Sequence, residues 1–206
     1  MYMQAEEECK KLYNTGLWVS IFTNIRFWTS SFTQIEQFVP KVGKILDLGC
    51  GYGIFGNYLA LSSEKRIIIG VDTDAGKIKF ANKGVPNSSF LIGDATKMKI
   101  DSFKAIAILD VMHHLNSYED QENLIKNCEK MLIRNGVLVI SDVDSNPFWK
   151  LILARLTDFI MYKGAPVYYR YKKDMIKMLK KYFKNVKARK LKNNPFPHIV
   201  YICQKE

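Results

Sequence analysis

The sequence predicts an α/β fold with one mostly parallel sheet, helices on both faces and an antiparallel last strand. Between residues 45 and 141, short apolar runs alternate with segments of helical periodicity. This alternation is typical of parallel strands joined by crossover helices. Near its end the chain has two strand-like runs separated by a five-residue turn. A connection this short joins strands that run in opposite directions.

The first strand of the sheet is predicted where Ile45 and Leu46 lead into Asp47. Further strands are expected at short apolar stretches bounded by Gly, Asp or Ser, namely 67–72, 89–92, 105–109 and 137–141. Helical periodicity places helices between them at 55–62, 75–82 and 120–133, with one more short helix before residue 105.

Residues 1–40 are predicted to be an N-terminal helical segment. Helices are expected at 4–13, through an aromatic stretch that contains Trp18 and Trp28, and at 33–38, where Pro40 ends the pattern. The core of the fold is assigned to 41–145, and the chain is expected to be a single domain.

An insertion at 146–172 follows the fifth strand. Residues 148–162 have a helical pattern in which Lys150 and Arg155 lie opposite an apolar face. That face contains Phe148, Trp149, Ile152, Leu153, Leu156, Phe159 and Ile160. Ligands of open α/β sheets gather at the carboxyl ends of the strands, so we expect this segment to be a lid over an acceptor. Packing of its apolar face against the core is the alternative.

The C-terminal part, 173–206, is predicted to form a helix at 173–183 and strands at 186–191 and 198–204. Residues 150–206 contain 15 Lys or Arg against Asp158, Asp174 and Glu206, whereas the whole chain has a net charge of +11. The basic excess therefore belongs to this quarter of the chain. It suggests an anionic partner, with an ordinary solvated Lys-rich helix as the alternative.

The apolar tracts, the N-terminus and the cysteines of the sequence argue against several classes of protein. No apolar tract reaches the ~18 residues that a membrane span requires, and the N-terminus lacks a basic-then-apolar leader. The four cysteines lie far apart without a C-x-x-C pair, which argues against a zinc site or a disulfide framework. A cytoplasmic protein is expected.

Three alternating glycines follow the first strand, in the stretch Asp47-Leu48-Gly49-Cys50-Gly51-Tyr52-Gly53. Glycine is needed where a backbone must approach a ligand closely. A second acid, Asp72, closes the next strand and is expected beside this loop, where it can accept hydrogen bonds from ribose hydroxyls.

Two cofactor classes compete for the loop. Gly51, Gly53 and Gly56 match the fingerprint G-x-G-x-x-G, so NAD is a candidate. Asp47 argues against NAD, because a carboxylate at the strand end repels a pyrophosphate and attracts an ammonium or sulfonium.

The pattern Asp-x-Gly-x-Gly-x-Gly resembles motif I of the class I S-adenosylmethionine (SAM) methyltransferases. Residues 90–95, 105–115 and 136–142 resemble later motifs, and Asp110-x-x-His113-His114-Leu115 is similar to the quinone-biosynthesis-type small-molecule branch. The resemblance implies a Rossmann-like seven-stranded sheet, SAM as donor, S-adenosyl-L-homocysteine as product and no metal. The cofactor-binding residues that it implies are Asp47, Gly49, Cys50, Gly51, Gly53, Asp72, Thr73, Asp94, Ala95, Leu109 and Asp110.

Methyl transfer from a sulfonium is an in-line displacement, so the protein mainly aligns the acceptor and in some cases supplies a base. The candidates for catalysis are His113, His114 and Asp142, with structural histidines as the alternative. Candidates for acceptor binding are His114, Asp144, Tyr168, Tyr169 and Arg170, and Arg170 is suited to a carboxylate or phosphate.

The acceptor is expected to be a small or lipid-linked molecule, methylated on O or C. Residues 148–192 combine an amphipathic helix with a basic one and suggest contact with an anionic membrane at its inner face. The alternatives are an RNA methyltransferase that uses the basic C-terminal face, or a SAM-binding regulator without catalysis.

Overall fold

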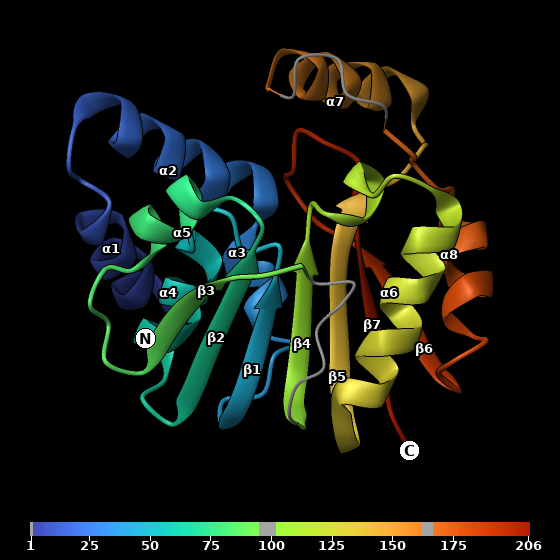
Figure 1. Ribbon diagram of the computed structural model, residues 1–206. Coiled ribbons are helices and arrows are strands. Elements are labelled where there is room, and N and C mark those ends of the chain that lie inside the picture. Colours follow the sequence, from blue (N-terminus) through green and yellow to red (C-terminus); the bar gives the residue numbers. More distant parts are fainter. Residues whose placement is uncertain (1, 95–101, 162–166) are drawn as a thin grey trace.

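The computed structural model describes residues 2–94, 102–161 and 167–206. Its seven-stranded sheet has the order β3-β2-β1-β4-β5-β7-β6 (Figure 1). The strands are β1 (Gly43–Leu48), β2 (Arg66–Asp72), β3 (Ser88–Ile92), β4 (Phe103–Leu109), β5 (Leu132–Val143), β6 (Asn185–Lys190) and β7 (His198–Gln204). Strand β7 runs antiparallel to β5 and β6, whereas β1 to β5 pair in parallel. The predicted fold class and the antiparallel last strand are confirmed.

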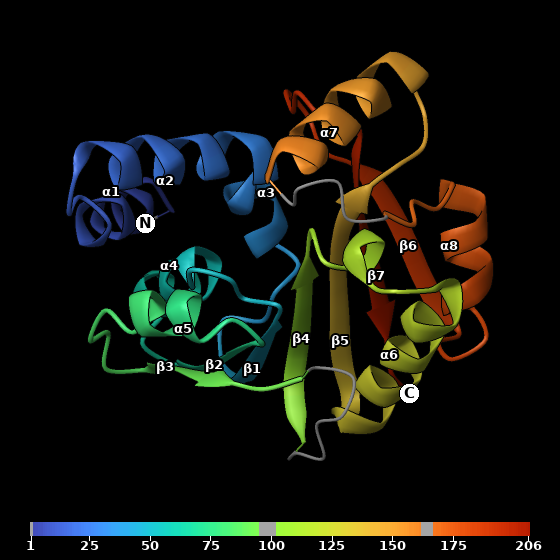
Figure 2. The same ribbon diagram turned by 45° about the horizontal axis from the view of Figure 1, so that its top comes forward.

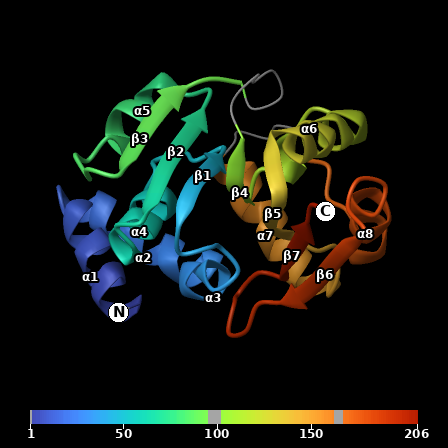
Figure 3. The same ribbon diagram turned by 90° about the horizontal axis from the view of Figure 1, so that it is seen from below.

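Helices cover both faces of the sheet, as the view from below in Figure 3 shows. They are α1 (Tyr2–Leu12), α2 (Leu17–Ser30), α3 (Phe32–Glu36), α4 (Ile54–Ser62), α5 (Ala75–Ala81), α6 (Tyr118–Met131), α7 (Phe148–Met161) and α8 (Lys172–Leu179), with a short 3₁₀ helix, η1, at Met112–His114. The short helix expected before residue 105 falls at 95–101, outside the described residues.

Alternate residues of each central strand enter two separate cores. Ile45 packs with α1, α3 and α4 on one face, and Leu46 packs with α6 and α8 on the other. Successive side chains of a strand point to opposite faces. The central strands read as continuous apolar runs because both of these faces are covered.

The N-terminal segment is fixed to the sheet by a buried ion pair. Glu36, at the end of α3, and Arg66, at the start of β2, are both fully buried, and Arg66 Nη1 lies 2.8 Å from Glu36 Oε1. Burial by itself would raise the pKa of Glu36, but hydrogen bonds from Lys41, Ser62 and Arg66 hold that pKa below its usual value. The sequence does not predict this pair, because its two members are thirty residues apart.

Two predicted boundaries are wrong at the end of α6. The helix ends at Met131 rather than at residue 133, and β5 begins at Leu132 rather than at residue 137. Leu132 pairs with Phe103 of β4, and the Asn135 amide donates to the Lys205 carbonyl. Strand pairing with distant segments therefore overrides the local helical pattern here.

Helix α7 lies at the end of the molecule toward which β4 and β5 point, as does α2 (Figure 2). Its apolar face is not packed against the core, so that alternative is wrong: Phe148 and Phe159 are each 67% exposed. The buried side chains of α7 are Leu151 and Ala154, which pack with Val143 of β5. Among the described residues no helix is both long and apolar enough to cross a membrane.

Candidate functional site

The glycine loop lies at the carboxyl end of β1 and has the left-handed backbone that its sequence requires. Gly49, Gly51 and Gly53 have φ values of 69°, 53° and 70°. A Cβ on Gly49 would lie 2.4 Å from Val111 Cγ2, and one on Gly53 would lie 2.6 Å from Ala81 Cβ. Neither glycine has room for a side chain.

Gly51 differs from the other two, because a Cβ built there meets no atom within 4 Å. The loop backbone is therefore bare and open at its tip. The Gly51 amide donates to Asp72 Oδ2 at 2.8 Å, and Asp72 Oδ1 accepts from the Asp74 amide. Gly51 and Asp72 therefore lie side by side, as predicted.

Tyr13, which directly follows α1, supports the loop from outside. Its hydroxyl donates to the Tyr52 carbonyl at 2.7 Å and accepts from Asn57 Nδ2 at 2.8 Å. The ring of Tyr52 in turn lies edge-on against Phe22 of α2. The N-terminal segment thus takes part in shaping the loop, which the sequence analysis missed. Tyr13 belongs to no recognisable sequence motif, so the sequence does not indicate this contact.

Asp47 is 2% exposed, and its Oδ2 atom has no hydrogen-bond partner. Burial raises the pKa of Asp47 to about 7; a backbone hydrogen bond from Gly56 opposes that rise, and the nearby Asp72 charge adds to it. A buried carboxylate oxygen without a donor is costly, so this position favours a ligand that brings a positive charge or an N–H group. The orphaned oxygen and the open tip at Gly51 fit the amino-acid end of SAM.

The other predicted cofactor residues are placed as follows. Cys50 points its thiol toward Gly70 and packs with Ile78 and Phe90, where burial raises its pKa well above the usual range. Leu109 is buried at the end of β4. Thr73 is exposed and Asp94 is half-buried beyond β3. Ala95 lies outside the described residues. Their roles toward the cofactor stay predictions.

Asp110, directly after β4, is the centre of a polar cluster that links α2 to β7. It pairs with Arg26 Nη1 at 3.0 Å, accepts from Ser30 Oγ at 3.0 Å and contacts His198 Nε2 at 2.6 Å. Burial by itself would raise the pKa of Asp110, but the charges of His198 and Arg26 hold it well below its usual range. Asn194 Oδ1 lies 3.2 Å from the other ring nitrogen of His198.

Arg26, Ser30, Asn194 and His198 were missed by sequence reasoning. For His198 a signal existed, because an antiparallel last strand begins at the edge where the parallel strands end. His198 pairs in register with Val143 at the end of β5. Nothing in the sequence indicates that α2 reaches Asp110.

Two of the three predicted catalytic groups, His113 and Asp142, lie together. His113 Nδ1 contacts Asp142 Oδ1, and the His113 amide donates to Asp142 Oδ2 at 3.2 Å. The His113 ring stacks on Tyr169 with ring centroids 4.9 Å apart. Because the carboxylate accepts, it fixes the orientation of the imidazole, as in an Asp–His dyad.

His114 lies beside this pair, with its ring centroid 4.1 Å from that of His113. Burial, followed by the His113 charge, lowers the pKa of His114 to about 4. Val111, which precedes η1, is the residue against which Gly49 packs, so the histidines follow directly on the segment that touches the glycine loop.

Three of the predicted acceptor residues make contacts that hold the segment after α7. Asp144 Oδ1 accepts from the Lys172 amide, and the Tyr168 amide donates to the His113 carbonyl. Arg170 donates to Gln121 Oε1 and to the Tyr118 carbonyl, and its guanidinium lies 4.5 Å from the Tyr118 ring centroid.

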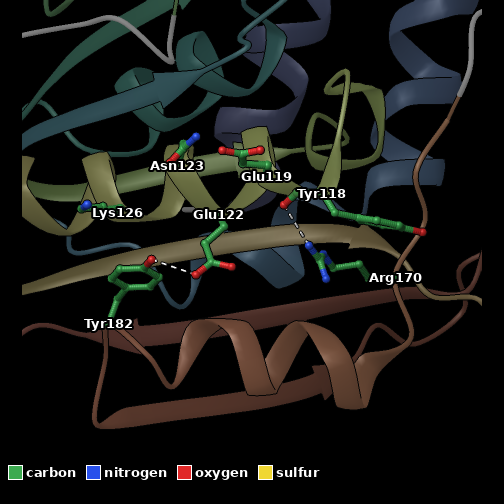
Figure 4. A pocket seen from close by; sticks show the side chains of 7 residues that line it. All are labelled: Tyr118, Glu119, Glu122, Asn123, Lys126, Arg170 and Tyr182. Atoms are coloured by element: carbon green, nitrogen blue, oxygen red, sulfur yellow. Dashed lines mark hydrogen bonds between the residues drawn. The ribbon is translucent and has the colours of Figure 1, made fainter.

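Arg170 also lines a shallow pocket beside α6 (Figure 4). There Tyr182 donates to Glu122, and Glu119, Asn123 and Lys126 complete the lining. This pocket is formed by the outer side of α6 and the α8 region, apart from the glycine loop. The acceptor role of Arg170 stays a prediction.

In the described part of the chain no three His, Cys, Asp or Glu side chains converge as metal ligands would.

The candidate site is composed of two parts along one edge of the sheet. The glycine loop with Asp47 and Asp72 forms the first, and the Asp110 and His113 clusters form the second.

Comparison with known proteins gives a consistent result. The family model described as a methyltransferase domain matches residues 46–140. A putative methyltransferase, 235L, of Invertebrate iridescent virus 6 is 27% identical over 136 residues, which cover 60% of this chain and 51% of the viral protein. The demethylmenaquinone methyltransferase of Thermotoga maritima is 28% identical over 102 residues, covering 48% of this chain and 43% of that protein. The chain thus spans about half the length of these curated relatives.

Among solved structures, the PH0226 protein from Pyrococcus horikoshii OT3 superposes with a TM-score of 0.68 at 18% identity, covering 88% of this chain and 96% of that one. At this identity the likeness concerns the fold alone. The match of the methyltransferase domain spans the glycine loop and the strands that form the site. By this match and its seven-stranded fold, the chain is similar to the class I S-adenosylmethionine-dependent methyltransferases.

Proposed function

We propose that this protein transfers a methyl group from SAM to a small organic acceptor, on O or C. The observation that carries the proposal is the orphaned oxygen of buried Asp47 beneath a bare three-glycine loop whose tip is tied to Asp72. When bound, SAM supplies a methyl group on a positive sulfur with a good leaving group. The protein must then bind the donor and the acceptor, align them, and exclude water from the site.

Each part of the loop has a role in this proposal. Asp47 attracts the positive amino-acid end of the donor, and Gly51 leaves room for it. Asp72 accepts from ribose hydroxyls with the lone pairs that its two backbone contacts leave available, and Asp94 reaches the adenine. The loop itself is pre-formed, since Tyr13 and Val71 hold it through hydrogen bonds to and from its backbone.

The acceptor end is assigned to His113, His114 and Asp142. An imidazole with a pKa of about 4 is uncharged at neutral pH but is a weak base, so His114 is suited to accept a hydrogen bond from an acceptor hydroxyl rather than to remove its proton. The similarity to a protein named demethylmenaquinone methyltransferase supports a quinol-type ring as the acceptor class.

The proposal is tested by calorimetry with SAM, S-adenosyl-L-homocysteine and NAD, followed by turnover with methyl-labelled SAM. The acceptors are a reduced naphthoquinone, a catechol and total RNA, and the readout is the label in each product. We expect binding of SAM and of its demethylated product, no binding of NAD, and transfer to the quinol or catechol. Label in RNA alone would favour the RNA alternative, and binding without any transfer would favour a regulator.

Gly51→Val is the loop variant, and Gly84→Val is its matched control. Both glycines have positive φ, 53° and 77°, and a Cβ meets nothing within 4 Å at either position. Both substitutions therefore impose the same backbone strain, but only Gly51 is in the loop. We expect SAM binding to be lost in Gly51→Val and retained in Gly84→Val. Equal affinities of the two variants would contradict the loop assignment.

A further inference from the structure

Two helices at one end of the molecule present apolar side chains to solvent. On α2 these are Leu17, Trp18, Ile21, Ile25 and Trp28, and on α7 they are Phe148, Trp149, Ile152, Leu156 and Phe159, each at least 41% exposed. Within each helix their spacing places them on one face. We call these two exposed faces together the α2–α7 platform. Exposed apolar patches of this kind mark interaction surfaces.

The platform contains every tryptophan of the chain. The sequence has three, and Trp18, Trp28 and Trp149 are 81%, 62% and 65% exposed. Tryptophan is usually well buried in proteins that contact only water. It is enriched where one side of a surface is apolar and the other wet, as at the interface of a membrane.

Helix α7 has its larger apolar face directed outward. The side toward the protein carries the buried Leu151 and Ala154, together with Lys150, whose Nζ donates to the Asn194 carbonyl at 2.8 Å. The guanidinium of the exposed Arg155 lies 5.7 Å from the Tyr169 ring centroid. These contacts fix the orientation of the helix, so the outward apolar face belongs to the folded state.

Positive charge borders the platform. The exposed Lys192 lines the same groove as Trp28, in which the other charged side chains, Lys10 and Glu6, form an ion pair. Lys150 Nζ lies 5.4 Å from the Trp149 ring centroid. In the sequence, residues 9–35 contain no Asp or Glu, and α7 carries Lys150 and Arg155 against Asp158. A second copy of the chain would bring these cations together. An anionic bilayer would attract them.

We propose that the α2–α7 platform docks on an anionic lipid bilayer. Both helices lie at the carboxyl edge of the sheet (Figure 2). Helix α2 reaches Asp110 through Arg26, and α7 packs on Tyr169, which stacks on His113. Docking in this way would direct the acceptor end of the site toward the lipid. The inference that docking brings the site to a lipid-borne acceptor rests on the proposed function, but the docking itself is measured without SAM.

Helix α8, which the sequence suggested as part of the membrane surface, lies on the flank of the sheet beside α6 (Figure 1).

The test uses the full chain with vesicles of phosphatidylcholine alone or mixed with phosphatidylglycerol. Because all three tryptophans lie on the platform, tryptophan fluorescence reports on it alone. We expect a blue shift, quenching by brominated lipid and co-sedimentation with the anionic vesicles, all weakened by salt. Absence of binding, or equal binding to both vesicle types, would overturn the proposal. So would a dimer in light scattering whose formation alone accounts for the blue shift.

Variants locate the contact. Trp18→Ser/Trp28→Ser on α2 and Phe148→Ser/Phe159→Ser on α7 should each weaken vesicle binding by at least about 10-fold, since each removes two large apolar side chains. The control is Val42→Ser/Ile67→Ser, which removes exposed apolar side chains, 50% and 57% exposed, near the opposite end of β1 and β2. It should bind vesicles as the wild type does, and equal loss in all three variants would contradict the platform.

Calorimetry with SAM on the same variants separates the two proposals. Unchanged SAM affinity together with lost vesicle binding places the effect on docking. If the wild-type chain binds vesicles but not SAM, the proposed function fails and the docking surface stands.

Discussion

At the scale of single residues, the buried Asp47 carboxylate destabilises the fold, and the same carboxylate is proposed to bind the cationic donor. It is fully buried, its Oδ2 atom lacks a partner, and its pKa is about 7 rather than the usual 3.8. Between about pH 4 and 7 the unfolded chain releases a proton that the folded chain keeps. The free energy of unfolding therefore falls as pH rises through this window and levels off above it.

Asp47→Asn should remove this fall. The variant should be more stable than the wild type at pH 8, by a few kcal/mol at most, and should bind SAM about 10- to 100-fold more weakly. In the wild type, SAM affinity should rise with pH up to about 7, because the ionised form binds the cationic donor. Urea unfolding and calorimetry across pH measure both effects.

The control for this variant is Glu119→Gln, which removes an exposed carboxylate at the start of α6. It should leave both curves unchanged. A wild-type SAM affinity that does not vary between pH 5 and 8 would contradict the assigned role of Asp47.

At the scale of elements, α2 is the helix whose position matters most for the site. Its contacts with the sheet edge are polar: Arg26 and Ser30 reach Asp110, and Thr29 accepts from Asn194. The face of α2 opposite the platform buries Thr23 and Phe27. A helix held this way depends on few contacts, so its stability should be sensitive to each.

Arg26→Met should loosen α2 selectively. The Arg26 and Asp110 side chains are 30% and 17% exposed, so the pair is partly screened and is expected to contribute about 1 kcal/mol. Hydrogen exchange of the α2 amides should become several-fold faster, while β4 and β5 stay unchanged. Arg134→Met, at an exposed position in β5, is the control. Unchanged exchange in α2 would show that the pair does not hold the helix.

At the scale of the whole molecule, the Glu36–Arg66 pair joins the N-terminal segment to the sheet. Arg66 also donates to the Pro40, Val39 and Leu59 carbonyls, so one guanidinium connects α3, α4 and β2. Breaking a buried pair leaves an uncompensated charge in the core.

Arg66→Met should therefore lower the free energy of unfolding by about 3–5 kcal/mol, measured by urea denaturation. Lys181→Met is the matched control, because Lys181 pairs with Glu122 at the surface and is 52% exposed. Its loss should cost less than about 1 kcal/mol. Similar losses for both variants would mean that the buried network does not secure the N-terminal segment.

The sequence by itself determined the sheet, its antiparallel last strand and the glycine loop. These follow from local patterns: apolar runs that alternate with helical periodicity, a turn too short for a crossover, and glycines where the backbone needs positive φ. It also determined that Asp47 and Asp72 meet at one edge, because parallel strands end together.

Only the tertiary structure decided how the ends of the chain complete the site. Arg26 meets Asp110, and Tyr13 meets the Tyr52 carbonyl. Strand β5 begins at Leu132 because distant segments supply its hydrogen bonds. Helix α7 directs its larger apolar face outward because Leu151, Ala154 and Lys150 hold its other side to the protein. Each of these depends on contacts between segments far apart in the chain, and a local pattern carries no information about such contacts.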